Sequence, residues 1–278
     1  MTESRHTAEG RYYRRFDEYQ RVTHIFLMLS FLGLAGTGLP LRFAGDAWAA
    51  ALARLWGGYE AAGTIHRFCA VILIGAFGAH VGKILWQVYR HRDYGALWGP
   101  TSMVPQPRDL NEMYRHFLWF VGLGPRPAFD RFTYWEKFDY WAVFWGMLVI
   151  GGSGLLLWFP VLFATFLPGW LFNIAMVIHG EEALLAVGFI FTVHFFNGHI
   201  RPEKFPMDLV IFTGRVTGHE LVDERPAEYE RLAREGRLAM YEATPPSRRS
   251  VLVGRVLGTT AVVVGLTTVA FIVAAVLL

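Results

Sequence analysis

The sequence predicts an all-α integral membrane protein, with a four-helix transmembrane bundle followed by a fifth, C-terminal transmembrane helix. The 278-residue chain is 54% hydrophobic and only 18% charged, whereas a soluble domain carries roughly 25% charged residues. Its mean hydropathy is +0.32. Charged residues are missing from stretches of roughly 18 residues or more, which is the length of a membrane-spanning helix: residues 22–41, 140–178, 183–200 and 256–278.

This composition excludes a soluble enzyme or a nucleic-acid-binding domain as the main role of the chain. The net charge of +3 comes from basic residues in the loops, so no nucleic-acid partner is predicted. The single cysteine, Cys69, excludes a disulfide framework, a cysteine-based zinc or iron–sulfur site and covalent haem attachment.

The apolar stretches give five helices in chain order. The first runs from about Val22 to Leu41 and breaks near Pro40, and the second runs from about Gly63 to Tyr89. The run from Tyr140 to Ile178 is too long for one span. It is interrupted at residues 158–160 and 167–169, which predicts a third helix, a short re-entrant or surface segment, and a fourth helix that continues to about Ile200. Residues 251–278 form the fifth helix.

The loop charges predict the orientation of the chain. Lys and Arg crowd residues 1–21, the loop 90–137 and the segment 201–250, whereas residues 43–62 and 160–170 contain only Arg54. By the positive-inside rule the first three segments are cytoplasmic and the C-terminus is outside. We therefore expect a cytoplasmic N-terminus (1–21), a four-helix membrane domain (22–200), a cytoplasmic segment (201–250) and the fifth helix (251–278). No signal peptide is expected, and Asp109–Val121 has an aromatic face that we expect to lie along the membrane surface.

Histidines form two pairs with matching spacing. His66 and His80 share the second helix, and His179 and His194 share the fourth. Helix geometry puts each pair near one face, at two depths about 20 Å apart. Because neutral imidazoles can ligate haem iron from both sides, this arrangement predicts two stacked haems b. The outer haem is assigned to His66 and His179. For the inner haem, His194 is one ligand and either His24 or His80 is the other.

Glycines accompany these histidines, and two roles remain open for them. They provide surface free of side chains against a macrocycle, or they serve ordinary close packing of helices in the membrane. They are Gly33, Gly36, Gly38, Gly75, Gly78, Gly82, Gly146, Gly151, Gly152, Gly154 and Gly188.

Several motifs resemble those of bacterial b-type cytochrome membrane subunits. They are R-V-T-H (21–24) with L-A-G-T-G-L-P (34–40), T-I-H-R (64–67), I-H-G-E-E (178–182) and V-H-F-F-N-G-H-I-R-P-E-K-F-P-M-D (193–208). The group includes the cytochrome b subunits of formate dehydrogenase, nickel–iron hydrogenase and thiosulfate reductase. Residues 129–145 and 201–208 look closest to the members associated with multihaem c-type cytochromes. The resemblance covers residues 15–215 and implies a four-helix core, two haems b, exchange with the quinone or menaquinone pool, and a bacterial inner membrane.

The resemblance also bears on the inner ligand. In the formate dehydrogenase type the ligands match His24, His66, His179 and His194, which favours His24, whereas the shared face with His66 favours His80. The histidine that is not used would lie near the haem edge or a quinone. A third haem would need another pair of ligands.

Four further residues are candidates for the site. Glu181 and Glu182 would accept protons from quinol, or else they are solvated beyond the bilayer. Arg67 would pair with a haem propionate, or it is an interfacial anchor. Asn197, with His199, would hold a quinone carbonyl, or it caps the helix end.

The sequence thus predicts an electron-transfer subunit that links the quinone pool to an extracytoplasmic c-type cytochrome or oxidoreductase subunit. Whether the chain is itself an enzyme stays open, because it contains no motif of a soluble catalytic centre. The alternatives are a membrane transporter with a proton relay and a passive anchor for a partner enzyme.

Overall fold

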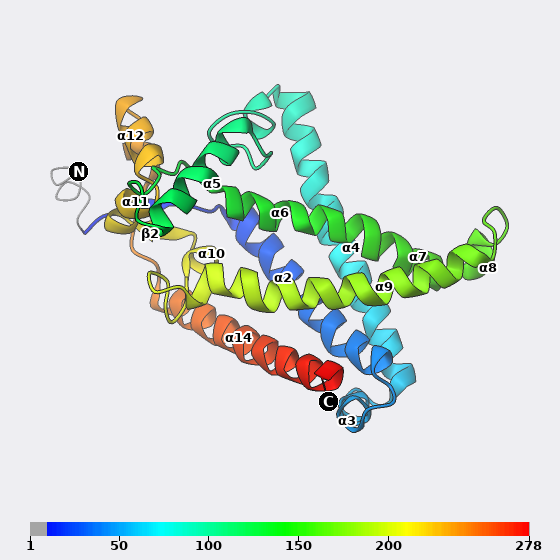
Figure 1. The fold of residues 1–278 in the computed structure, drawn as a ribbon. Coiled ribbons are helices and arrows are strands. Elements are labelled where there is room, and N and C mark those ends of the chain that lie inside the picture. Colours follow the sequence, from blue (N-terminus) through cyan, green and yellow to red (C-terminus); the bar gives the residue numbers. More distant parts are fainter. Residues whose placement is uncertain (1–9, 278) are drawn as a thin grey trace. The chain divides into compact units, whose positions relative to one another are not determined.

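The computed structural model describes residues 10–277, and most of them are helical (Figure 1). Among these described residues, five helices are long and apolar enough to cross a membrane, which confirms the predicted number of spans and the prediction of a multi-pass membrane protein. Residues 1–9 of the predicted N-terminal segment and residue 278 of the fifth helix lie outside the described residues.

The first three spans begin one turn or more before the stretches that predict them, whereas the fourth and fifth agree with their predicted bounds to within three residues. The first, second and fifth spans are single helices: α2 (Glu18–Arg42), α4 (Tyr59–His91) and α14 (Arg248–Leu277). The third span consists of α6 (Tyr134–Gly146), η2 (Met147–Gly151) and α7 (Gly152–Trp158). The fourth consists of α9 (Trp170–Phe189), η3 (Ile190–His194) and η4 (Phe196–Ile200). The segments η2, η3 and η4 are π-helical turns. Short helices α3 (Ala47–Leu55) and α8 (Pro160–Phe163) follow the first and third spans.

Helix α2 continues through Pro40 and ends at Arg42, although the sequence predicts a break there. Proline has no N–H to donate to the carbonyl four residues earlier, which here is that of Gly36. The indole Nε1 of Trp56 donates to this carbonyl at 2.9 Å instead. A side chain from the next segment therefore satisfies the acceptor that proline leaves open, and the helix is not interrupted.

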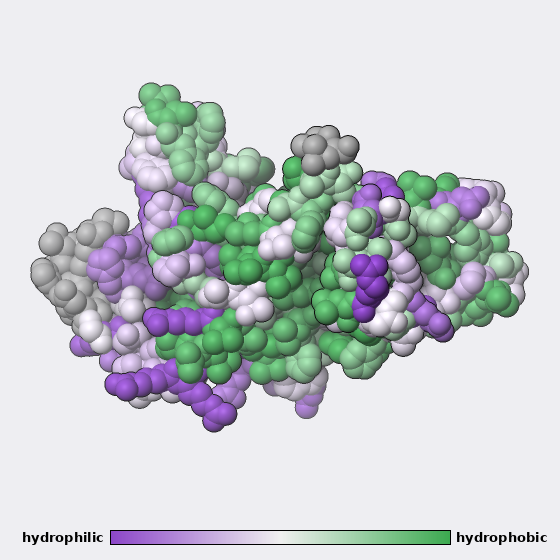
Figure 2. All heavy atoms as spheres, turned by 90° about the horizontal axis from the view of Figure 1, so that it is seen from below, coloured by the Kyte–Doolittle hydropathy of each residue, from purple (hydrophilic) through white to green (hydrophobic). Residues whose placement is uncertain are grey.

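The chain divides into two compact units. The first, which we call the bundle unit, consists of residues 22–79, 143–208 and 255–277. Its core joins α2, the fourth span and α14 through a cluster of buried residues: Ala35, Val187, Phe191, Phe195 and Ala261. A Cβ added at Gly265 of α14 would lie 2.5 Å from Phe191 and 2.6 Å from Phe195, so glycine is needed where α14 crosses these rings. Large apolar side chains also cover much of the surface in Figure 2, as lipid-facing helices require.

The second unit, the sheet unit, contains residues 10–21, 80–142 and 209–254. Its three-stranded antiparallel sheet has the order β2-β1-β3, with β1 at Tyr12–Arg14, β2 at Arg215–Thr217 and β3 at Glu242–Ala243. Tyr13 pairs with Val216 on one side and with Glu242 on the other. The sequence does not predict these strands, because segments this short show no readable alternation.

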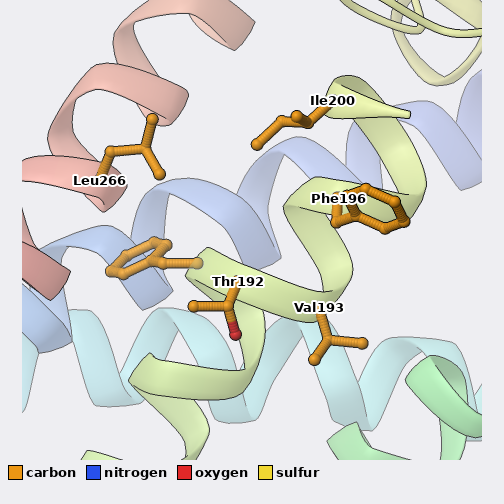
Figure 3. Close-up of a pocket in the computed structure, with 6 residues that line it drawn as sticks. Thr192, Val193, Phe196, Ile200 and Leu266 are labelled. Atoms are coloured by element: carbon orange, nitrogen blue, oxygen red, sulfur yellow. The ribbon is translucent and has the colours of Figure 1, made fainter. Parts of the chain in front are cut away.

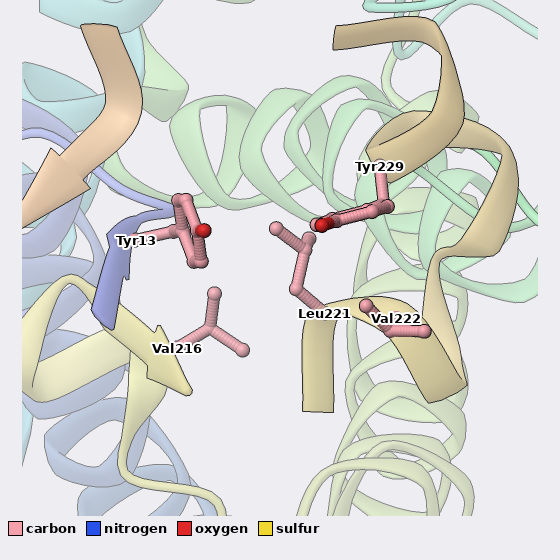
Figure 4. Packing of buried hydrophobic residues seen from close by; sticks show 5 residues of the cluster. All are labelled: Tyr13, Val216, Leu221, Val222 and Tyr229. Atoms are coloured by element: carbon pink, nitrogen blue, oxygen red, sulfur yellow. The ribbon is translucent and has the colours of Figure 1, made fainter. Parts of the chain in front are cut away.

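The sheet unit has its own hydrophobic core (Figure 4). Tyr13 and Val216 of the sheet pack with three residues of the following helices: Leu221, Val222 and Tyr229. The helices of this unit outside the spans are η1 (Tyr94–Ala96), α5 (Pro107–Phe120), α10 (Val210–Thr213), α11 (Gly218–Glu224), α12 (Pro226–Arg234) and α13 (Leu238–Tyr241).

Candidate functional site

The bundle unit brings together His66 of α4 and His179 of α9, the residues predicted to hold the outer haem. Their ring centroids lie 6.2 Å apart, and the ring planes are inclined by 76°. Sequence spacing predicts that both histidines lie at the outer depth of the membrane. The structure adds that their rings lie close together in an edge arrangement between α4 and α9.

Both rings are fixed through the same nitrogen, Nδ1. His66 Nδ1 lies 3.0 Å from the Thr37 hydroxyl of α2. His179 Nδ1 lies 3.0 Å from the carbonyl oxygen of Ile150 in η2 and 3.4 Å from the Ser153 hydroxyl. A π-helical turn thus supplies the carbonyl that orients His179, and such turns are frequent at functional sites.

The partners also determine which nitrogen carries the proton. A carbonyl oxygen only accepts, so His179 Nδ1 must donate to Ile150. The Thr37 hydroxyl already donates to the Gly33 carbonyl at 2.6 Å, so its oxygen accepts from His66 Nδ1. With Nδ1 protonated in both neutral rings, the lone pair of each ring is on Nε2.

Two glycines make room for the imidazoles. A Cβ added at Gly38 would lie 3.1 Å from Cε1 of His66, and one added at Gly154 would lie 2.9 Å from Cε1 of His179. A larger residue at either position would push the ring from its place. Of the two roles considered for the glycines, these two positions show close packing, here against the histidine rings.

The hydroxyl partners, Thr37 and Ser153, are candidate site residues that sequence reasoning missed, although the sequence contains a signal for them. Gly36-Thr37-Gly38 and Gly152-Ser153-Gly154 are two copies of a glycine–hydroxyl–glycine motif. Each motif lies on the span that precedes a histidine-bearing span, and each provides both a hydrogen-bond partner and a close glycine for that histidine.

The two imidazoles of this pair would be able to hold a group that takes two nitrogen ligands from the protein. Their ring centroids lie 6.2 Å apart. Among the described residues no group of three or more His, Cys, Asp and Glu is placed to hold a metal ion. A haem iron needs only two protein ligands, since the macrocycle supplies the other four.

A second group of histidines lies at the other end of the bundle unit. His24 of α2 is close enough to His194 and His199 to interact with both electrostatically. The Nδ1 atoms of His24 and His199 are buried and have no hydrogen-bond partner. A buried, unpaired ring nitrogen is costly unless something binds it, so this end of the bundle also has capacity for a ligand.

His80, the other candidate for the inner position, has a different environment within the sheet unit. Its Nε2 lies 2.8 Å from the hydroxyl of Tyr140 on α6. The two rings are in edge contact, with centroids 5.6 Å apart. The nitrogen of His80 that could bind iron is therefore already in a hydrogen bond, unlike Nε2 of His66 and His179.

The remaining candidates lie on the surface of the bundle unit or are partly buried in it. Glu181 forms an ion pair with Arg42 of α2 at 2.5 Å, and both side chains are about half exposed. Glu182 accepts a hydrogen bond of 3.3 Å from the indole of Trp145. Arg67 is exposed and contacts Thr64 at 3.5 Å. Asn197 is partly buried on η4.

An apolar hollow of about 430 Å³ lies beside the π-helical turns (Figure 3). Thr192 is the one polar residue among those that line it: Phe191, Thr192, Val193, Phe196, Ile200 and Leu266. Its shape and lining suit a hydrocarbon chain more than a polar ligand.

Comparison with known proteins gives no independent assignment. The sequence matches no protein family, and no curated protein matches it. The functional assignment therefore depends on the geometry of the histidines.

Proposed function

We propose that this chain is a di-haem b cytochrome, the membrane subunit through which an oxidoreductase complex exchanges electrons with the quinone pool. The observation that carries the proposal is the His66–His179 pair, with ring centroids 6.2 Å apart and with Nδ1 of each ring fixed by a hydrogen bond. Two neutral imidazoles whose Nδ1 atoms are fixed in this way would be able to hold one haem iron.

The residues of this chain would hold the outer haem by keeping two imidazoles in one tautomer and one orientation. Thr37 and the Ile150 carbonyl accept the Nδ1 protons, and Gly38 and Gly154 allow the rings to stay against the neighbouring helices. Haem b supplies reversible one-electron chemistry when bound. The hydrogen bond that Nδ1–H donates would raise the basicity of Nε2, the nitrogen that would bind the iron.

For the inner haem we propose His194 and His24 as the ligands. His24 is close to His194, and its buried Nδ1 lacks a partner, whereas Nε2 of His80 is hydrogen-bonded to Tyr140. His80 then keeps its hydrogen bond to Tyr140 and does not bind iron. These contacts and the resemblance to formate dehydrogenase cytochromes support the same choice.

Quinone exchange would use groups at either end of the bundle unit. Glu182 is the better proton acceptor of the two acids, because Glu181 is already paired with Arg42. Asn197 is a hydrogen-bond donor for a quinone carbonyl, and the apolar hollow on the same helix suits an isoprenoid chain. Arg67, next to His66 in the sequence, would pair with a propionate. We further propose a bacterial inner-membrane location and a redox partner, a c-type cytochrome or an oxidoreductase subunit, on the extracytoplasmic side.

The test is the reduced-minus-oxidised absorption spectrum of the purified protein, with haem counted per chain. We expect a b-type signal and two haems. His66→Ala and His179→Ala should each remove one haem and leave the other spectrally intact, because the lost ligand serves one site only. His219→Ala is the matched control, since His219 is exposed on α11 and pairs only with Asp223. It should keep both haems.

A colourless protein would exclude a cytochrome and leave the transporter or the passive anchor. If His179→Ala retained two haems, the outer assignment would be wrong even for a haem protein. For the inner site, we expect His24→Ala to lose one haem and His80→Ala to keep both.

A further inference from the structure

Helix α5 (Pro107–Phe120) of the sheet unit buries its polar face and exposes its apolar face. A helix on the surface of a water-soluble domain has the opposite arrangement. Asp109 and His116 are each 7% exposed, whereas Phe117, one residue after His116, is 62% exposed.

The buried face of α5 is held by specific polar contacts. Lys137 of α6 is 1% exposed and donates hydrogen bonds of 2.8 and 2.9 Å to the two carboxylate oxygens of Asp109. The His116 ring stacks on Trp119 and on Trp135, and its Nδ1 lies 3.1 Å from the Tyr134 hydroxyl. These contacts fix the rotation of α5 about its own axis and so determine which residues face outward.

The outward face is a continuous apolar stripe, which we call the α5 stripe. Its members recur every three or four residues and are 47% to 67% exposed: Leu110, Met113, Tyr114, Phe117, Phe120 and Val121. Contact with water would be unfavourable for six large apolar side chains that lie together on one face.

Two further features indicate what covers the stripe. In the chain, α5 lies between two candidate spans, after α4 ends at His91 and before α6 begins at Tyr134, and its buried face packs on the start of α6. The exposed charges of residues 90–126 are mainly basic, with Arg90, Arg92 and Arg115 against Asp93. Apolar and aromatic residues flanked by arginine are typical of helices that lie in the interface of an anionic bilayer.

We propose that α5 is an interfacial anchor, with its apolar stripe among the lipid headgroups and acyl chains and with Arg115 at the phosphates of anionic phospholipids. The proposal is independent of the haem assignment, because none of its residues takes part in the histidine sites. It makes the position of the sheet unit dependent on the lipid composition of the membrane.

The test uses the single cysteine of the chain. In a Cys69→Ser background, Phe117→Cys places a spin label in the middle of the stripe, and Asn111→Cys places one on the exposed polar edge of the same helix. Both variants are reconstituted in nanodiscs of phosphatidylcholine, with or without phosphatidylglycerol. The accessibility of each label to oxygen and to a water-soluble nickel chelate is then measured by electron paramagnetic resonance.

We expect the label at position 117 to be accessible to oxygen and shielded from nickel, with an oxygen-to-nickel ratio several-fold above that at position 111. Phosphatidylglycerol should increase this ratio, and Arg115→Gln should remove the increase. Equal nickel accessibility at both positions would overturn the proposal, and so would an immobile label at 117 that neither reagent reaches, since protein would then cover the stripe. A ratio that is indifferent to phosphatidylglycerol would overturn the role of anionic lipid. Leu110→Cys repeats the test if Phe117→Cys fails to fold.

Discussion

At the scale of single residues, the candidate outer site depends on glycines, whose missing side chains leave room for the histidine rings. Gly154 is the clearest case, because the missing side chain allows the His179 ring to lie against α7. We expect Gly154→Ala to displace this ring and to lower the haem content of the purified protein by close to half. The added Cβ would lie 2.9 Å from Cε1 of His179, closer than packed carbon atoms approach.

Gly152→Ala is the matched control for this experiment. It lies two residues away on the same helix, and a Cβ there would meet nothing within 4 Å. Both variants carry the same change in helix propensity, so a difference between them reports the contact with His179. Equal haem content in the two variants would show that the close approach is not required.

A second residue-scale prediction concerns Glu112, on the buried side of α5. Its Oε2 atom is buried without a hydrogen-bond partner. Burial, together with the nearby Asp109 carboxylate, raises the pKa of Glu112 to about 7, although Arg108 and Lys137 oppose the shift and Asp130 adds slightly to it. The folded protein therefore holds a proton that the unfolded chain has released, and its stability should fall as the pH rises from about 4.5 to about 7.

Glu112→Gln should remove this pH dependence and stabilise the protein at pH 8 by an amount on the order of 1 kcal/mol, because partial exposure weakens the effect. Thermal unfolding of the original protein and of Glu112→Gln in detergent at pH 5, 6, 7 and 8 measures this difference in stability. The difference between the two curves should be smallest at pH 5, close to the ordinary pKa of a glutamate, and largest at pH 8. A constant difference at every pH would contradict the assignment to Glu112.

At the scale of secondary-structure elements, a buried ion-pair network joins three segments of the sheet unit that are far apart in sequence. Glu228 of α12 accepts from Arg15 at 2.9 Å and from Arg131 at 2.8 Å. Arg225 pairs with Glu136 of α6 at 2.9 Å. Burial lowers the pKa of Arg15 to about 10, so its guanidinium is still charged at neutral pH and the network stays ionised.

Removing one partner of a buried ion pair leaves an uncompensated charge and costs several kcal/mol. We therefore expect Glu228→Gln to destabilise the sheet unit by about 3 kcal/mol and to increase its cleavage by protease. Glu230→Gln is the control, because Glu230 is exposed on the same helix. Limited proteolysis of the two variants under native conditions compares them. Similar cleavage rates would mean that the network adds little to stability.

Some of the secondary-structure elements could be predicted from the sequence and others could not. The five spans could be predicted, because a run of about 20 uncharged, mostly apolar residues is rarely anything but a membrane-spanning helix. The sheet could not, because strands of two or three residues depend on pairing between segments some 200 positions apart. The continuation of α2 through Pro40 also depends on a tertiary contact, the hydrogen bond from Trp56.

The candidate site could also be predicted only in part, because tertiary contacts orient its residues. Helical spacing identified His66 and His179 as residues at one depth, but it could not reveal that Thr37 and the Ile150 carbonyl orient them. For His194 the predicted face requires a regular α-helix. This residue lies in the π-helical turn η3, where the rotation per residue is smaller, so the face it shares with His179 cannot be calculated from 3.6 residues per turn.

At the scale of the whole molecule, the sheet provides a test of the number of spans that is independent of hydropathy. Strand β1 pairs with β2, so both strands must lie on the same side of the membrane. An even number of crossings must therefore separate residues 12–14 from residues 215–217, and four candidate spans lie between them. The Arg131–Glu228 ion pair requires the loop after α4 to lie on the same side as the sheet. This agrees with the number of spans, because two candidate spans separate that loop from β1.

With the sheet on one side of the membrane, the segments after α2 and after α7 must lie on the other, and the positive-inside rule predicts that the sheet side is cytoplasmic. In a Cys69→Ser background we expect a membrane-impermeant thiol reagent to label Arg54→Cys and Thr165→Cys in intact cells. Glu230→Cys should react only after the cells are permeabilised. All three positions are exposed, so accessibility within the protein does not bias the comparison. The reverse pattern would invert the orientation but keep the span count, whereas equal labelling of positions 54 and 230 in intact cells would contradict four spans between the paired strands.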